Sequence, residues 1–146
     1  MSATAPLERA IAVATKVLDR VDKEDMGKPT PCASWNVGQL VNHLIGANYF
    51  FVAMLGGEAP GGGGDFSAGA YRGAFDEASA ASLAKFGEPG AFDKTINLPW
   101  GAIPGNAFFG LATTDLFQHS WDLAKATGQS TDLDRELAEQ LRLFGS

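Results

Sequence analysis

Cysteine, histidine and positive charge are all scarce in this chain. Its single cysteine, Cys32, excludes a disulfide within the chain and favours a reducing, cytoplasmic location. Lys and Arg number 11 against 17 Asp and Glu, which gives a net charge of −6. This balance argues against a basic surface that would bind nucleic acid or an anionic membrane. No apolar run is long enough to cross a bilayer. Charges interrupt the apolar N-terminal stretch, so we expect no signal peptide.

The residues that are abundant indicate a folded, soluble protein. Of 146 residues, 45% are hydrophobic and only 19% are charged, which is typical of a globular chain and not of a disordered one. This length suits one hydrophobic core. We therefore expect a single domain over residues 1–146.

Helical periodicity recurs in four long segments, at about residues 7–21, 36–55, 68–86 and 104–127. Between the third and the fourth, the segment DKTINLPWG alternates in polarity and predicts a short strand pair or extended segment. A short C-terminal helix is expected at 132–144, with Leu133, Leu137, Leu141 and Phe144 on one side. The fold class is therefore all-α: a bundle of four antiparallel helices with one longer crossover.

Capping residues mark several of these boundaries. Asn36 can cap the second helix while Gln39 reaches back three residues later, and the helix should stop at Gly56 and Gly57. Gly128 should end the fourth helix in the same way. The loop GGEAPGGGGDF resembles a phosphate cradle only superficially, because no Gly-Lys-Ser/Thr follows it and no strand precedes it. It is interpreted as a flexible connection.

Polar groups interrupt the apolar faces of the second and fourth helices. At about 100° per residue, His43 shares a face with Leu40 and Ala47, toward the interior of the bundle. On the fourth helix, Asp115 and His119 are four residues apart and project together, with Asp122 a further turn along.

Three arrangements could satisfy these groups, whose burial without partners would be costly. Asp115 and His119 can form an ordinary helical pair while His43 is a hydrogen-bonded core residue. Asp115 can orient His119 as a general base, although no Ser or Cys stands in a recognisable nucleophile turn. Alternatively, all three can converge on a divalent metal ion, since i, i+4 spacing places two donors beside one ion.

Two segments bear a family resemblance. TPCASWNVGQLVNHLIG resembles the second-helix signature of the DinB-like metal-binding superfamily, and in particular the branch of the mycothiol-dependent maleylpyruvate isomerase N-terminal domain. DLFQHSWDLAKATGQ is similar to that branch's second signature, and the likeness extends from the first helix to Gln129. The resemblance implies a four-helix bundle with one divalent metal ion, usually zinc or nickel. Its ligands would be His43, Asp115 and His119, although the branch more often has glutamate where this chain has Asp115.

The resemblance also implies a chemistry. Members of this group include transferases and isomerases that use low-molecular-weight thiols such as mycothiol or bacillithiol. The expected function is therefore that of a metal-dependent thiol transferase or isomerase acting on a small electrophile. The isomerase carries a further C-terminal domain for which this chain has no room, so maleylpyruvate isomerisation itself is not expected. Two alternatives are a non-catalytic metal-binding or sensory module and a helical protein without metal. A homodimer is compatible with the superfamily.

Five further residues are candidates for roles near this site. Asp122 can hydrogen-bond a metal-binding histidine or tie its helix to the N-terminal segment. Trp100 can line the mouth of a pocket or pack in its turn. Trp35 and Trp121 are expected to anchor the core. Cys32 is interpreted as a small buried residue between helices, with a ligand or a thiol partner as the alternative.

Overall fold

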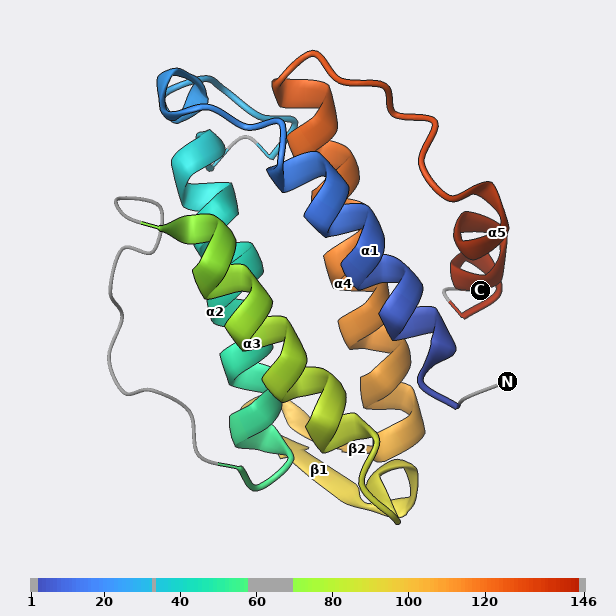
Figure 1. Cartoon of the computed structure of the whole chain (residues 1–146). Coiled ribbons are helices and arrows are strands. Elements are labelled where there is room, and N and C mark those ends of the chain that lie inside the picture. Colours follow the sequence, from blue (N-terminus) through green and yellow to red (C-terminus); the bar gives the residue numbers. More distant parts are fainter. Residues whose placement is uncertain (1–2, 33, 58–69, 145–146) are drawn as a thin grey trace.

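The chain folds into a bundle of four long helices (Figure 1). The computed structural model describes residues 3–32, 34–57 and 70–144. The long helices are α1 (Ala5–Leu18), α2 (Val37–Met54), α3 (Tyr71–Phe86) and α4 (Gly105–Ala126). The shorter elements are η1 (Lys23–Asp25), η3 (Ala91–Asp93), β1 (Thr95–Leu98), β2 (Gly101–Pro104) and α5 (Arg135–Phe144). This architecture confirms the predicted helical bundle, its short extended segment and its C-terminal helix.

Each long helix packs against two or three others. α1 lies against α4 and α3, and α2 lies against α3 and α4, while α5 covers the outside of α4 and α1. α2 and α3 run in the same direction, and α1 and α4 run in the opposite one (Figure 1). The neighbours α2 and α3 are therefore parallel, so the expectation that all helices pack antiparallel was too simple. Their shared direction fits the single longer crossover that was expected.

The N-terminus of α2 is held by the expected capping box. Asn36 Oδ1 accepts a hydrogen bond of 2.9 Å from the backbone amide of Gln39. The side chain of Gln39 accepts one of 2.9 Å from the amide of Asn36. Each residue thus satisfies an amide that the helix leaves without a partner. This cap determines where α2 begins, and with it the place of His43 two turns later.

A β-hairpin and a close backbone contact set the start of α4. β1 and β2 pair antiparallel, with Ile96 opposite Ile103. The chain then turns at Gly105, whose amide donates to the carbonyl of Lys94. A Cβ atom at Gly105 would lie 2.0 Å from the carbonyl oxygen of Ala91. Only glycine fits at this first residue of α4, as close approach of two backbones requires.

The core consists of aliphatic side chains from all four long helices and an aromatic cluster. The rings of Phe51, Phe86 and Phe108 lie 5.7 to 6.4 Å apart, and Phe109 packs against Phe86 at 5.3 Å. One polar link crosses this core: Ser82 Oγ donates a 2.7 Å hydrogen bond to Asn48 Oδ1, and both residues are fully buried. Within residues 3–32, 34–57 and 70–144, every buried side-chain nitrogen or oxygen has a hydrogen-bond partner.

Several predicted details differ from the structure. α1 ends at Leu18, three residues earlier than expected, and α5 begins at Arg135. Trp121 was expected in the core but is 37% exposed. The predicted start of the third helix and most of the glycine-rich loop lie outside the described residues. Leu137 and Leu141 of α5 are buried as predicted, whereas the side chain of Phe144 is not among those described. None of the described helices has the length and apolar character to cross a membrane.

Candidate metal centre

Two histidines and one aspartate meet between α2 and α4. His43 Nε2 of α2 lies 3.2 Å from Asp115 Oδ2 and 3.4 Å from Asp115 Oδ1. His119 Nε2, one helical turn after Asp115 on α4, lies 3.3 Å from Asp115 Oδ1. One donor atom from each of the three side chains lies within 4.8 Å of the others. The structure thus brings together the three residues proposed as ligands, and their binding of an ion stays a prediction.

The carboxylate between the two rings has an unusual acidity. Burial alone would raise the pKa of Asp115, but hydrogen bonds from His119 and His43 and their positive charge lower it to about 2. Conversely, the hydrogen bond to Asp115 raises the pKa of His119, against the opposing effect of burial. In the absence of a metal ion, the site therefore favours an aspartate anion beside a protonated His119.

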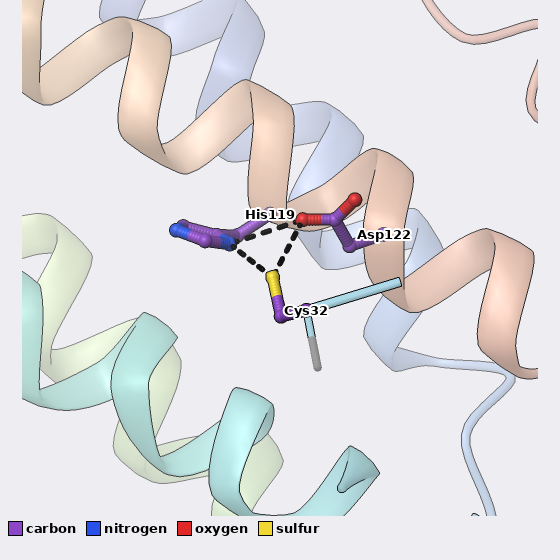
Figure 2. Close-up of side chains that lie close together, drawn as sticks. All are labelled: Cys32, His119 and Asp122. Carbon is purple, nitrogen blue, oxygen red and sulfur yellow. Dashed lines mark hydrogen bonds and ion pairs between the residues drawn. The ribbon is translucent and has the colours of Figure 1, made fainter. Parts of the chain in front are cut away.

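The other ring nitrogen of His119 faces a second group of side chains (Figure 2). Asp122 Oδ2 lies 3.2 Å from His119 Nδ1 and accepts a hydrogen bond of 3.2 Å from the thiol of Cys32. Cys32 Sγ is 3.8 Å from His119 Nδ1. Burial, followed by the hydrogen bond to Asp122, raises the pKa of the Cys32 thiol to about 11. Asp122 thus contacts His119, as one of its two predicted roles requires, and also the segment before α2.

Trp35 forms an aromatic wall beside the two histidines. Its ring centroid lies 4.6 Å from that of His43 and 5.5 Å from that of His119. The two imidazole rings themselves meet edge to face, with centroids 4.7 Å apart. Trp35 also packs against the hydrophobic core, as expected. It therefore restricts the rotation of both imidazoles as well as anchoring the segment before α2.

Among the residues that the structure describes, three pockets adjoin the site. A polar pocket of about 720 Å³ lies beside His43 and is lined by Asn36, Gln39 and Asn42 among others. An apolar pocket of about 480 Å³ is lined by Gly46, Ala47, Phe50, Phe51, Leu111 and Trp100, with His43 and Asp115 also in its lining. A third, of about 600 Å³, runs along α4 past His119. Trp100 is 68% exposed at the turn of the hairpin and lines the apolar pocket.

The chemistry of these side chains fits a divalent metal ion. Two imidazole nitrogens and one carboxylate form a donor set that zinc uses in catalytic sites, where further coordination positions stay open. All three side chains are partly accessible, with 17 to 29% of their surface exposed. Asp122 can accept a hydrogen bond from Nδ1–H of His119, which leaves the lone pair of Nε2 free on the side of Asp115. The three donor atoms lie within 4.8 Å of one another.

Comparison with known proteins identifies the family. Residues 7–137 match the mycothiol maleylpyruvate isomerase N-terminal domain family. The chain therefore belongs to this family, as the two signature segments indicated.

Two relatives and one solved structure extend this comparison. Two Mycobacterium tuberculosis proteins, "Uncharacterized protein Rv0738" and "Uncharacterized protein MT0763", are each 39% identical over 133 residues. That alignment covers 90% of this chain and 70% of each relative. The crystal structure of the mycothiol-dependent maleylpyruvate isomerase aligns with a TM-score of 0.70 at 15% identity and covers 94% of this chain. The chain spans 65% of the length of that protein, and the likeness shows the shared fold.

Sequence reasoning missed two contacts at this site. Trp35 was expected only as a core anchor, and Cys32 was interpreted mainly as a small buried residue, yet it is partly exposed with its thiol on Asp122. Both lie in the loop between α1 and α2, where no periodicity predicts the direction of a side chain. Their closeness in sequence to Asn36, which positions α2, was the one available signal.

Proposed function

We propose that this protein binds one divalent metal ion, zinc or nickel, through His43, Asp115 and His119. With that ion it would act as a thiol-dependent transferase or isomerase on a small electrophile. The observation that carries the proposal is the convergence of two imidazoles and one carboxylate at a point where three pockets open. Membership of the mycothiol maleylpyruvate isomerase N-terminal domain family supports it independently.

The side chains of the site have separate tasks in this proposal. His43 and His119 supply nitrogen donors from facing helices, and Asp115 supplies the negative charge between them. Asp122 holds His119 in the tautomer with the proton on Nδ1. Bound there, a divalent ion would supply Lewis acidity, which lowers the pKa of a coordinated thiol so that it reacts as a thiolate.

Two of the pockets differ in the polarity of their linings, and this difference suggests which reactant each would receive. The pocket lined by Asn36, Gln39 and Asn42 offers amide groups to a polar thiol such as mycothiol or bacillithiol. The pocket lined by Phe50 and Trp100 suits the apolar part of an electrophile. His43 lines both, so the two reactants would meet beside it.

Metal analysis tests the first half of the proposal. Protein purified without an affinity tag should contain about one equivalent of zinc or nickel. Made in a Cys32→Ser background, which removes the neighbouring thiol as an alternative ligand, His43→Ala and His119→Ala should lose it while circular dichroism shows the helices intact. Asp132→Asn, which changes an exposed carboxylate paired with Arg135, serves as the control and should keep the metal. Full metal content in both histidine variants would refute this ligand set.

Thiol binding tests the second half. The metal-loaded protein should bind mycothiol, bacillithiol or another cellular thiol and catalyse its addition to, or transfer to, a small electrophile. The His43→Ala variant should lose both activities. If no thiol binds the metal-loaded protein and no electrophile is consumed, the enzymatic proposal fails and a non-catalytic metal-binding or sensory module takes its place.

A further inference from the structure

A second group of side chains that could ligate a metal ion lies on the Nδ1 side of the His119 ring, opposite the side that faces Asp115. It consists of Cys32 from the loop before α2 together with His119 and Asp122 from α4 (Figure 2). The three donor atoms form a compact triangle: Sγ to Oδ2 is 3.2 Å, Nδ1 to Oδ2 is 3.2 Å, and Sγ to Nδ1 is 3.8 Å. Figure 2 shows all three atoms directed toward one another.

This triangle matches the spacing that one ion imposes on its ligands. Zinc lies about 2.3 Å from sulfur and about 2.0–2.2 Å from nitrogen or oxygen. In a tetrahedral arrangement, those bond lengths separate two ligand atoms by about 3.3–3.6 Å. The observed separations of 3.2, 3.2 and 3.8 Å differ from these by a few tenths of an ångström, which side-chain rotation alone can supply.

We propose that Cys32, Asp122 and Nδ1 of His119 form a second, thiolate-containing site for a thiophilic divalent ion such as Zn²⁺, Cd²⁺ or Co²⁺. On binding, the S–H bond of Cys32 breaks, its proton passes to the buffer, and the sulfur–metal bond forms. The two positive charges of the ion then neutralise the negative charges of one thiolate and one carboxylate. Cys32 is partly exposed, which gives the ion a path to the sulfur.

The second site shares one residue with the site proposed above but does not rest on it. It uses Nδ1 of His119, whereas the first uses Nε2. A neutral imidazole has only one free lone pair, so occupation of either site should weaken binding at the other. The second site needs neither His43 nor Asp115, and it can therefore be examined in a protein that lacks the first.

Cobalt titration of the His43→Ala/Asp115→Asn double variant is the direct test. Because Cys32 is the only cysteine in the sequence, any sulfur-to-cobalt charge-transfer absorption in the near ultraviolet reports on this residue alone. The band should appear and saturate at one equivalent of Co²⁺. Adding Cys32→Ser to the same background should abolish it. A folded double variant that binds Co²⁺ without the band, or does not bind it, would overturn the proposal.

Alkylation of the His43→Ala single variant, in which the first site has lost a ligand, gives a second measurement that does not depend on the double variant folding. Saturating Cd²⁺ should slow the reaction of Cys32 with iodoacetamide, whereas Mg²⁺, which avoids thiolate ligands, should not. The Asp122→Asn variant should lose most of the protection by Cd²⁺. An alkylation rate that Cd²⁺ leaves unchanged in the His43→Ala variant would contradict the assignment.

Discussion

Replacing Asp115 with asparagine removes a negative charge and almost nothing else. The carboxylate lies 3.2 Å from His43 Nε2 and 3.3 Å from His119 Nε2. Interaction with the two rings lowers the pKa of Asp115 from 3.8 to about 2. Since one pKa unit corresponds to about 1.4 kcal/mol, the ionised carboxylate contributes on the order of 2 kcal/mol to the stability of the metal-free protein.

The sign of the pH dependence follows from the two shifts. The pKa of Asp115 is lowered, so its contribution is present above pH 3.8 and is lost as the pH falls toward 2. The pKa of His119 is raised above 6.5, so its contribution is complete below pH 6.5 and is lost as the pH rises through the raised value. The advantage of wild type over Asp115→Asn should therefore be largest between these limits and should shrink in alkaline solution.

Urea unfolding of chelator-treated protein measures this difference. At about pH 5.5 the variant should be less stable by about 2 kcal/mol, and at about pH 9 by much less than that. The matched control is Asp132→Asn, whose partner Arg135 stays charged throughout, so its effect should not change between the two pH values. An equal loss at both pH values for Asp115→Asn, or a larger one in alkali, would refute the electrostatic reasoning.

Four further substitutions test the site and the bundle. Asp122→Asn should weaken metal binding by about 10–100-fold in a calorimetric titration, because a neutral amide oxygen is a weaker acceptor for Nδ1–H of His119 than the carboxylate. Gly46→Ala should raise stability by about 0.5–1 kcal/mol, since its Cβ would meet nothing within 4 Å, whereas Gly105→Ala should lower it by at least about 2 kcal/mol. Asn48→Ala should cost about 1–3 kcal/mol in urea unfolding by removing the buried partner of Ser82. Unchanged metal affinity in Asp122→Asn would contradict the first of these predictions, and equal changes in stability for the two glycine variants would contradict the second. An Asn48→Ala variant as stable as the wild type would contradict the third.

The elements of this fold were predictable where local chemistry decides them. The capping box at Asn36 and the positive φ of 73° at Gly128 lie where the sequence indicated that helices begin and end. Periodicity also placed Asp115 and His119 on one side of one helix, because i, i+4 spacing allows little else. The shared direction of α2 and α3 was not predictable in this way, since it depends on how the chain crosses between them.

Residue type alone was a poor guide for the tryptophans. Trp121 follows Ser120, which is fully buried, and the core face of α4 continues at Leu123 and Ala124. Trp121 therefore stands at the edge of the buried stripe, where the angular position on the helix outweighs the preference of a large ring for the interior. Trp35 did reach the core, but its contact with both histidines depends on the path of an irregular loop.

The placement of His119 explains why the sequence favoured one group of candidate ligands over the other. Its Nε2 faces Asp115, which is on the same helix and was found from spacing, and His43, which the family signature supplied. Its Nδ1 faces Cys32, which is 87 residues away in sequence and belongs to a loop without periodicity. A single imidazole between two donor groups can serve only one ion while neutral. Which of its nitrogens keeps the proton therefore decides whether an ion would meet two nitrogens and an oxygen, or one sulfur, one nitrogen and one oxygen.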